Sequence, residues 1–347
     1  MNILVTGGAG FIGSNFITYL LRRRKDVQIV NLDKLTYAGN LENLQEVYDH
    51  PNHTFVQGDI CDQTLVDTLF KNHRINGVIH FAAESHVDQS IKQPTVFIQT
   101  NILGTLTVLE SARKHWLNKN GSYKEGYQDA RFHHISTDEV FGTLGDEGYF
   151  TEMTSYAPNS PYSASKASSD MLVRSYFHTY GLNVITTNCS NNYGPRQHNE
   201  KLIPTIIRNA LALEPIPIYG NGKNIRDWLF VTDHCRAIEK VFFEGKFGET
   251  YLIGGHYEKS NINVAEIICK ILDKLKPLAK NNKEIKSYRE LIQYVNDRPG
   301  HDYRYAIDDT KIRNECNWKN KYSFEEGINE TIRYYLNKQI KVITNEK

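Results

Sequence analysis

The sequence predicts a doubly wound α/β fold, in which helices cover both faces of a parallel sheet and a smaller C-terminal lobe follows. Up to about residue 188, short apolar runs alternate with amphipathic stretches, the pattern of successive strand, helix and strand units. A glycine-rich turn follows the first apolar run and opens a helix. After residue 195 the alternation breaks up, and prolines and glycines punctuate the chain.

Six strands are expected in the first part of the chain, over residues 3–6, 27–32, 54–57, 78–81, 132–136 and 184–188. Residues 96–116 and 162–180 show helical spacing, and Gly181 ends the second helix. Residues 249–253 again have a strand pattern. We therefore expect residues 1–192 plus about 226–256 to form the sheet domain, and about 193–225 plus 257–340 to form the lobe.

Composition excludes several classes of function. The 347 residues carry 41 basic and 40 acidic side chains, a net charge of +1 that offers no field to attract nucleic acid or an anionic membrane. No apolar run approaches membrane-spanning length, and the N-terminus lacks the features of a secretion signal. The five cysteines are scattered without a Cys-x-x-Cys pair, which favours a reducing cytoplasm over a disulfide framework.

The glycine-rich turn predicts a dinucleotide site of the Rossmann type. It supplies free N–H groups at a helix N-terminus, and its glycines let the backbone approach a pyrophosphate. Asp33 ends the second strand, where a carboxylate can accept hydrogen bonds from ribose hydroxyls and repel a 2′-phosphate. This favours NAD over NADP, although Lys34 beside it is a contrary signal. The turn and the strand ends that should face the cofactor are Gly7, Gly10, Phe11, Ile12, Gly13, Asp33, Asp59, Ile60, Phe81, Ala82, Ala83 and Ser85.

Tyr162 and Lys166 are candidates for hydride-transfer chemistry. They lie four residues apart on an expected helix, so both side chains project from the same face. An ammonium beside a phenol favours the phenolate and lowers its pKa. Tyr162 could then act as a base toward a sugar hydroxyl, and the small residues around it would let a cofactor lie close.

With these motifs in place, the chain resembles the extended short-chain dehydrogenase/reductase superfamily and, within it, the dTDP-glucose 4,6-dehydratase family. The resemblance covers nearly the whole chain. Besides the glycine turn and the Tyr-x-x-x-Lys pair, it rests on four ordered segments, residues 136–140 (STDEV), 188–195 (NCSNNYGP), 225–228 (IRDW) and 297–302 (DRPGHD).

The resemblance implies a reaction in which the sugar is first oxidised, then loses water, and is finally reduced again. Tyr162 would take the proton of the sugar C4 hydroxyl as NAD accepts the hydride, Glu139 would remove the C5 proton, and Asp138 would protonate the departing C6 oxygen. The hydride would then return to C6, and Thr137 would hydrogen-bond the C4 oxygen. The C4 ketone makes the C5 proton acidic, and a positioned acid makes hydroxide a better leaving group.

The resemblance also implies further ligand contacts. Cofactor contacts are expected from Lys34, Leu35, Thr36, Thr100, Tyr162, Lys166 and Asn192. The diphosphate of a nucleotide sugar needs cations, and a guanidinium suits bidentate phosphate contact. Substrate contacts, with the Tyr219 ring as a platform for the base, are expected from Ser85, Thr137, Asn191, Lys201, Leu202, Pro217, Ile218, Tyr219, Arg226, Asn261, Asp297, Arg298 and His301. No metal is expected.

The acid and the base impose a requirement on the local structure. Neighbouring residues of a strand point to opposite faces, so Asp138 and Glu139 can reach one sugar only if the strand ends near Thr137. We therefore expect a helical turn to begin there. For Asp138 to donate a proton near neutral pH, burial and repulsion by Glu139 must raise its pKa.

Other functions stay open at the level of sequence. The same reaction on UDP-glucose is the nearest alternative, followed by a nucleotide-sugar 4-epimerase, which has no use for the added acid and base. A non-catalytic NAD-binding sensor would not need Tyr162, Lys166 or the carboxylates. The resemblance implies a homodimer joined through the helices at 96–116 and 162–180.

Overall fold

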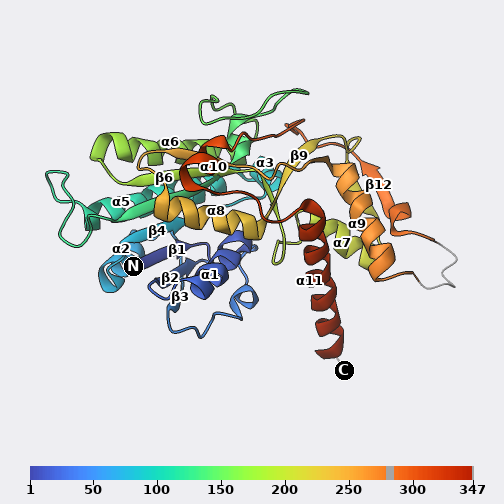
Figure 1. Cartoon of the computed structure of the whole chain (residues 1–347), viewed down its shortest axis with the longest axis horizontal. Coiled ribbons are helices and arrows are strands. Elements are labelled where there is room, and N and C mark those ends of the chain that lie inside the picture. The colour runs from blue at the N-terminus through green and yellow to red at the C-terminus, as the bar shows by residue number, and fades with distance from the viewer. Residues whose placement is uncertain (279–284, 346–347) are drawn as a thin grey trace.

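The computed structural model describes residues 1–278 and 285–345. Its centre is a seven-stranded parallel sheet in the order β10-β6-β5-β4-β1-β2-β3 (Figure 1). The doubly wound prediction is confirmed: the strand order reverses between β1 and β4, and such a switch point opens a crevice at the carboxyl ends of the strands. The strands are β1 (Asn2–Thr6), β2 (Gln28–Asp33), β3 (His53–Gln57), β4 (Gly77–His80), β5 (Arg131–Thr137), β6 (Val184–Cys189) and β10 (Thr250–Ile253).

Helices cover both faces of the sheet because its strands are apolar on both sides. In β1, Ile3 and Val5 pack with α1 and α8, whereas Leu4 packs with α2, α5 and α6 on the other face. A strand buried on both faces is typical of a parallel sheet. These helices are α1 (Phe11–Arg23), α2 (Gln63–His73), α5 (Thr105–Trp116), α6 (Pro161–Tyr180) and α8 (Val231–Glu244).

The helix expected over residues 96–116 is interrupted. It consists of α4 (Pro94–Phe97), a π-helical segment η2 (Ile98–Gly104) and α5, and the short helix α3 (Val87–Lys92) precedes it. At the wide turn, the carbonyl oxygen of Asn101 accepts hydrogen bonds from the hydroxyls of Thr105 and Ser169, both at 2.6 Å. Side-chain hydroxyls thus supply hydrogen bonds to a backbone carbonyl oxygen where the regular α-helical pattern is lost.

The smaller lobe is built from short strands and longer helices. β7 (Asn191–Tyr193), β9 (Ile225–Phe230) and β11 (Glu258–Ser260) form one sheet, and β8 (Ile216–Tyr219) pairs with β12 (Ile292–Val295). The helices α7 (Leu202–Ala212), α9 (Asn261–Leu275) and α11 (Phe324–Asn345) enclose its core, and α10 (Thr310–Cys316) packs back on α8 and β10.

The structure places the return to the first domain slightly later than expected. β9 pairs within the small sheet, so the chain rejoins the central sheet at α8 rather than at about residue 226. Residues 279–284, inside the expected lobe, lie outside the described part of the chain.

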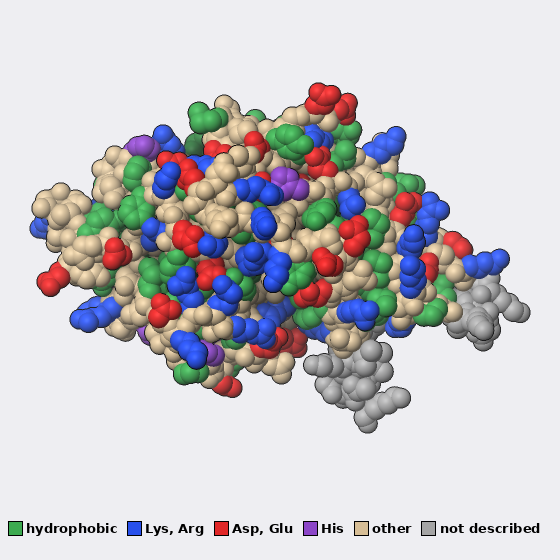
Figure 2. All heavy atoms as spheres, in the orientation of Figure 1, with side chains coloured by type: hydrophobic (Ala, Val, Ile, Leu, Met, Phe, Trp, Pro, Cys, Tyr) green, Lys and Arg blue, Asp and Glu red, His purple; other side chains and the backbone are tan. Residues whose placement is uncertain are grey.

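The surface shows no dominant charge on the face seen in Figure 2, where basic and acidic side chains intermingle over both parts of the molecule. Within residues 1–278 and 285–345, no helix has both the length and the apolarity needed to cross a membrane.

Candidate active site

A long cleft runs along the carboxyl ends of the central strands. It is lined by turns after β1, β2, β3 and β4, by the ends of β5 and β6, and by the N-terminus of α6. Of the expected cofactor residues, all but Leu35 line it. The side chain of Leu35 instead packs against the core beneath α1, and its own backbone has a left-handed φ of 56°.

The turn after β1 has the shape that a pyrophosphate requires. Gly7 has a φ of 71°, and a Cβ there would lie 2.7 Å from the backbone nitrogen of Ala82. A Cβ on Gly13 would lie 2.4 Å from the carbonyl oxygen of Gly7. Only glycine fits either place. Helix α1 begins at Phe11 and includes Gly13 in its first turn, and Gly10, Phe11, Ile12 and Gly13 line the cleft at its N-terminus.

Asp33 fits the ribose diol of NAD. The backbone N–H groups of Ala9 and Leu35 each donate to one carboxylate oxygen at 2.8 Å, which fixes the group at the cleft. Burial raises its pKa, and these N–H bonds oppose the rise. Lys34, the contrary signal, is paired with Asp59 at 2.7 Å, so its charge is already countered and less suited to a 2′-phosphate.

Strand β5 ends directly before Asp138 and Glu139, the expected acid and base. β5 stops at Thr137, and a 3₁₀ turn, η3 (Asp138–Phe141), begins at the next residue. The Thr137 hydroxyl oxygen accepts a hydrogen bond from the backbone N–H of Glu139 at 3.2 Å and so caps this turn. The predicted departure from extended geometry is confirmed, and both carboxylates line the same cleft.

The two neighbouring carboxylates have different surroundings. Asp138 is 1% exposed, and its Oδ2 has no hydrogen-bond partner among the described residues. Burial, then the charges of Glu139 and Asp227, hold the pKa of Asp138 well above its usual value, as predicted. Burial also raises the pKa of Glu139, but the nearby cations Arg298, Lys201 and Arg226 oppose that rise. Environments that separate two carboxyl groups in this way suit one to be an acid and the other a base.

Tyr162 and Lys166 project from the start of α6, whose first turn is fixed by Ser160, Pro161 and Ser163. Ser160 and Ser163 form a reciprocal capping box, and Pro161 occupies the first helical position. The ammonium of Lys166 donates to the carbonyl oxygen of Ile135 at 2.8 Å, and burial lowers its pKa.

The electrostatics of Tyr162 differ from the expectation. Burial, followed by the charges of Glu139, Cys189 and Asp138, holds its pKa well above the ordinary value, while a hydrogen bond with Thr137 opposes this. The predicted lowering is therefore wrong for the protein alone, because burial is the largest influence on the pKa of Tyr162 and the charges of the neighbouring acidic groups act in the same direction.

Cations converge on the other end of the cleft. Lys201 lines it and donates to the carbonyl oxygen of Ser85 at 2.7 Å. Arg226 is 5% exposed, and its guanidinium lies over the Tyr305 ring at 4.3 Å. Arg226 and Arg298 do not line the cleft, but their charges and that of Lys201 act on Glu139, so all three cations lie near one region where a diphosphate could bind. Ser85 and Asn191 also line the cleft.

Only some of the residues expected around the nucleotide base lie together in the structure. Tyr219 is 42% exposed, and its ring meets the His301 ring edge-on at 6.3 Å. His301 bonds Asp297 at 2.6 Å. Ile218, by contrast, is 1% exposed in the core of the lobe, and Leu202 packs against that core. Pro217 is exposed and Asn261 begins α9, and neither lines the main cleft.

Sequence reasoning missed several residues of the cleft. Cys189 ends β6 and Ser190 follows it, so the rule that ligands bind at the carboxyl ends of parallel strands could have found them. Gln197, His198 and Glu200 come from the irregular chain after β7, which carries no comparable signal. Within residues 1–278 and 285–345, no cluster of three histidine, cysteine or acidic residues could hold a metal ion.

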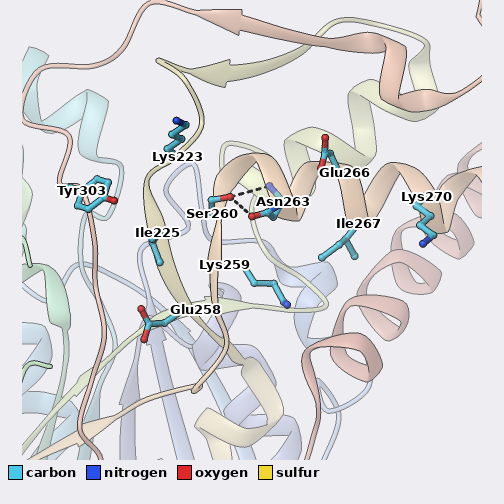
Figure 3. Close-up of a pocket in the computed structure, with 10 residues that line it drawn as sticks. All are labelled: Lys223, Ile225, Glu258, Lys259, Ser260, Asn263, Glu266, Ile267, Lys270 and Tyr303. Carbon is cyan, nitrogen blue, oxygen red and sulfur yellow. Dashed lines mark hydrogen bonds between the residues drawn. The ribbon is translucent and has the colours of Figure 1, made fainter. Parts of the chain in front are cut away.

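A second hollow, of about 710 Å³, is lined mainly by residues of β11 and α9 (Figure 3), and it shares no lining residue with the main cleft. Its side chains are mixed in charge, and Figure 3 shows Ser260 and Asn263 hydrogen-bonded to each other at the start of α9. The residues around it are Lys223, Ile225, Glu258, Lys259, Ser260, Asn263, Glu266, Ile267, Lys270 and Tyr303.

Comparison with known proteins relates this cleft to a group of enzymes. A family model described as GDP-mannose 4,6 dehydratase matches residues 4–331. The dTDP-glucose 4,6-dehydratase of Xanthomonas campestris pv. campestris (strain B100) is 54% identical over 336 residues, which are 97% of this chain and 93% of the relative.

Two solved structures share the whole fold. The Bacillus anthracis dTDP-glucose 4,6-dehydratase in complex with NAD has a TM-score of 0.84 and 46% identity, covering 98% of this chain and 97% of its own. The Streptomyces venezuelae dTDP-glucose 4,6-dehydratase DesIV with NAD bound has a TM-score of 0.86 and 42% identity, covering 98% of both chains.

Proposed function

This chain belongs to the dTDP-glucose 4,6-dehydratase family, and on that premise we propose that it converts dTDP-glucose to dTDP-4-keto-6-deoxyglucose. The reaction oxidises sugar carbon 4, eliminates water across carbons 5 and 6, and returns the hydride to carbon 6. The observation that carries the proposal is the turn at Thr137, which brings Asp138 and Glu139 into the cleft that Tyr162 and Lys166 also line. An epimerase would have no use for that turn.

The residues at the cofactor end of the cleft fit NAD. The glycine turn offers a cradle that a Cβ would fill, and Asp33 offers a carboxylate for the ribose hydroxyls. When bound there, NAD would supply hydride acceptance from carbon 4 and hydride return to carbon 6. No metal takes part in the proposed reaction.

Tyr162 is the proposed base for the C4 hydroxyl, and Thr137 is its partner. Burial and the charges of Glu139 and Asp138 favour the protonated phenol in the protein alone. A positive charge in the cleft, from Lys166 and from the oxidised nicotinamide, would favour the phenolate. Thr137 already makes the hydrogen bond that lowers the pKa of this phenol and is placed to share control of the same oxygen.

Glu139 and Asp138 are the proposed base and acid of the elimination. Glu139 takes the C5 proton, since the three cations around it favour its ionised form. Asp138 gives its proton to the C6 hydroxyl, which leaves as water, since burial favours its neutral form. A proton returned to carbon 5 balances the hydride returned to carbon 6.

The smaller lobe is proposed to hold the nucleotide. Lys201, Arg226 and Arg298 would bind the diphosphate, and Tyr219 would stack on the base beside His301. Ser85 and Asn191 would contact the sugar, and Asn192 the cofactor. Of the proposed substrate residues, only Ser85, Thr137, Asn191 and Lys201 line the main cleft. The roles proposed for Leu202, Pro217, Ile218, Tyr219, Arg226, Asn261, Asp297, Arg298 and His301 rest on the family resemblance and on the contacts given above.

We also propose a cytoplasmic homodimer. Apolar side chains stand exposed along the interrupted helix and α6, where a second copy would cover them. Val96, Ile98, Leu103 and Met171 are 39%, 51%, 50% and 57% exposed. A measurement of molecular size in solution tests the proposed dimer, and a monomer at micromolar concentration would contradict the dimer.

The function is tested by offering purified protein dTDP-glucose, UDP-glucose and GDP-mannose. A 4-keto-6-deoxy product gains ultraviolet absorbance after alkali treatment. We expect turnover to be fastest with dTDP-glucose. Absence of this product from all three substrates would contradict the dehydratase, and faster turnover of UDP-glucose would change the substrate.

A further inference from the structure

Asp302 joins parts of the cleft that lie far apart in the sequence. It is 7% exposed, and its two carboxylate oxygens accept hydrogen bonds from the Asn159 amide and from the Tyr305 hydroxyl, each at 2.6 Å. Its backbone carbonyl oxygen accepts from Arg226 Nη2 at 2.9 Å and from Asn224 Nδ2 at 3.1 Å. Asp302 is thus hydrogen-bonded to Arg226 through its backbone and to Asn159 through its side chain.

On the lobe side, Arg226 is held mainly by backbone. Its Nη1 donates to the carbonyl oxygens of Ile225 at 2.8 Å and Tyr303 at 3.3 Å. The Tyr305 ring lies against the guanidinium. None of these contacts involves the Asn159 side chain. A substitution of Asn159 therefore removes its bond to Asp302 and leaves the contacts that position Arg226 in place.

On the catalytic side, Asn159 lies two residues before the first residue of α6. The next residue, Ser160, caps the helix, and Tyr162 is its second helical residue. The segment before Asp302 touches Asn159 at a second point, because a Cβ on Gly300 would lie 2.9 Å from the Asn159 carbonyl oxygen. The segment of Gly300 and Asp302 therefore contacts the chain directly before the start of α6.

Tyr305 extends the connection to the acid and base. Its side chain is buried in one apolar cluster with Val140, Phe141 and Phe150. Val140 and Phe141 belong to η3, the turn that begins with Asp138. The Tyr305 ring thus lies against Arg226 and belongs to the apolar cluster that also holds the turn of Asp138.

We propose that Asp302 is a positioning residue that couples binding of the nucleoside diphosphate at Arg226 to the alignment of Tyr162 for hydride transfer. The inference rests on the proposed function and deepens it. When Arg226 binds the diphosphate, the Asp302 backbone is held in place, and the Asn159 bond then fixes the start of α6 relative to the sugar. Small misalignments between reacting groups cost large factors in rate.

Asn159→Ala and Tyr305→Phe test the proposal, since each removes one bond to Asp302 and keeps its backbone. Two quantities are measured: the affinity for dTDP, which has no sugar to align, and the rate of NADH formation after rapid mixing of NAD-loaded protein with saturating dTDP-glucose. We expect about tenfold slower NADH formation in each variant. The affinity for dTDP should change by less than about twofold.

A matched control comes from the same segment. Tyr303→Phe removes the hydroxyl that bonds Asp146 at 3.0 Å but leaves the Tyr303 carbonyl on Arg226. Its NADH formation should stay within about twofold of wild type. Because both test bonds act through Asp302, the double variant Asn159→Ala/Tyr305→Phe should be about as slow as the slower single variant.

Unchanged NADH formation in both test variants would overturn the proposal. A matching loss of dTDP affinity would also overturn it, since Asp302 would then serve binding alone, and so would effects that multiply in the double variant. A wild-type protein that makes no 4-keto-6-deoxy product would instead contradict the proposed function.

Discussion

The edge of the central sheet and the smaller lobe contribute to the cleft in different ways. The proposed chemical groups come from two regular elements, the end of β5 with its turn and the start of α6. The proposed nucleotide contacts come from separate segments around Lys201, Tyr219, Arg226 and Arg298, fastened by carbonyls and ring contacts. The proposed catalytic residues are thus positioned by local secondary structure, whereas the proposed nucleotide-binding residues are positioned by tertiary contacts. Substitutions on the two sides should therefore separate rate from affinity.

The largest effect is expected from Tyr162→Phe on the chemical side. Loss of the base should slow NADH formation from bound dTDP-glucose by roughly 10²- to 10⁴-fold, while dTDP affinity stays within about twofold. Rapid mixing and calorimetry measure the two quantities. The exposed Tyr48, changed to Phe as a control, should leave both unchanged. A near wild-type rate in Tyr162→Phe would remove Tyr162 from the mechanism.

On the lobe side, Arg226→Met should act mainly on binding. A charge-assisted contact to phosphate is worth about 1.5–3 kcal/mol, so dTDP should bind roughly 10- to 150-fold more weakly. The rate at saturating substrate should fall less than the affinity. Arg289→Met, which removes an exposed ion pair with Glu266, is the control. Unchanged dTDP affinity would place the diphosphate elsewhere.

The base platform predicts a smaller effect. Stacking of an aromatic side chain on a base is worth about 1–3 kcal/mol, so Tyr219→Leu should weaken dTDP binding about tenfold and leave the rate at saturation nearly unchanged. Tyr294→Leu, at a more exposed tyrosine of the same lobe, provides the comparison. Equal effects of the two changes would show that Tyr219 does not stack on the base.

The smallest expected effect concerns stability and distinguishes the two carboxylates. The folded state raises the pKa of Asp138, so between its unfolded and folded pKa values the folded protein binds more protons and loses stability as pH rises. Asp138→Asn removes this loss. Its melting temperature relative to wild type should therefore increase with pH over that window.

Glu139→Gln should show a weaker trend, because cations oppose the rise of the Glu139 pKa. Thermal melts from weakly acidic to weakly alkaline pH test both variants. A larger trend in Glu139→Gln than in Asp138→Asn would reverse the assignment of acid and base.

Much of the sheet region could be predicted because its information is local. The strand ends lie within one or two residues of expectation, and the turn at Asp138 followed from the demand that two carboxylates face one sugar. The break in the helix over 96–116 could not be predicted from local pattern, and the bond that Ser169 donates there to the carbonyl of Asn101 joins residues 68 apart.

The lobe was harder to predict for the same physical reason. The contact between Asn159 and Asp302 joins residues 143 apart. One feature of the lobe is local: strand alternation along β8 puts Ile216 and Ile218 in the core and leaves Pro217 and Tyr219 outside. Ile218 could therefore have been assigned to the core from sequence.

The central claim is that Asp138 acts after hydride transfer, as the acid of the elimination. It is tested most directly by mixing NAD-loaded Asp138→Asn protein with dTDP-glucose and following NADH absorbance and product together. NADH should form at close to the wild-type rate and then accumulate, because the oxidised sugar cannot lose water at the normal rate. Product formation at the wild-type rate, or slow product without accumulated NADH, would contradict this account.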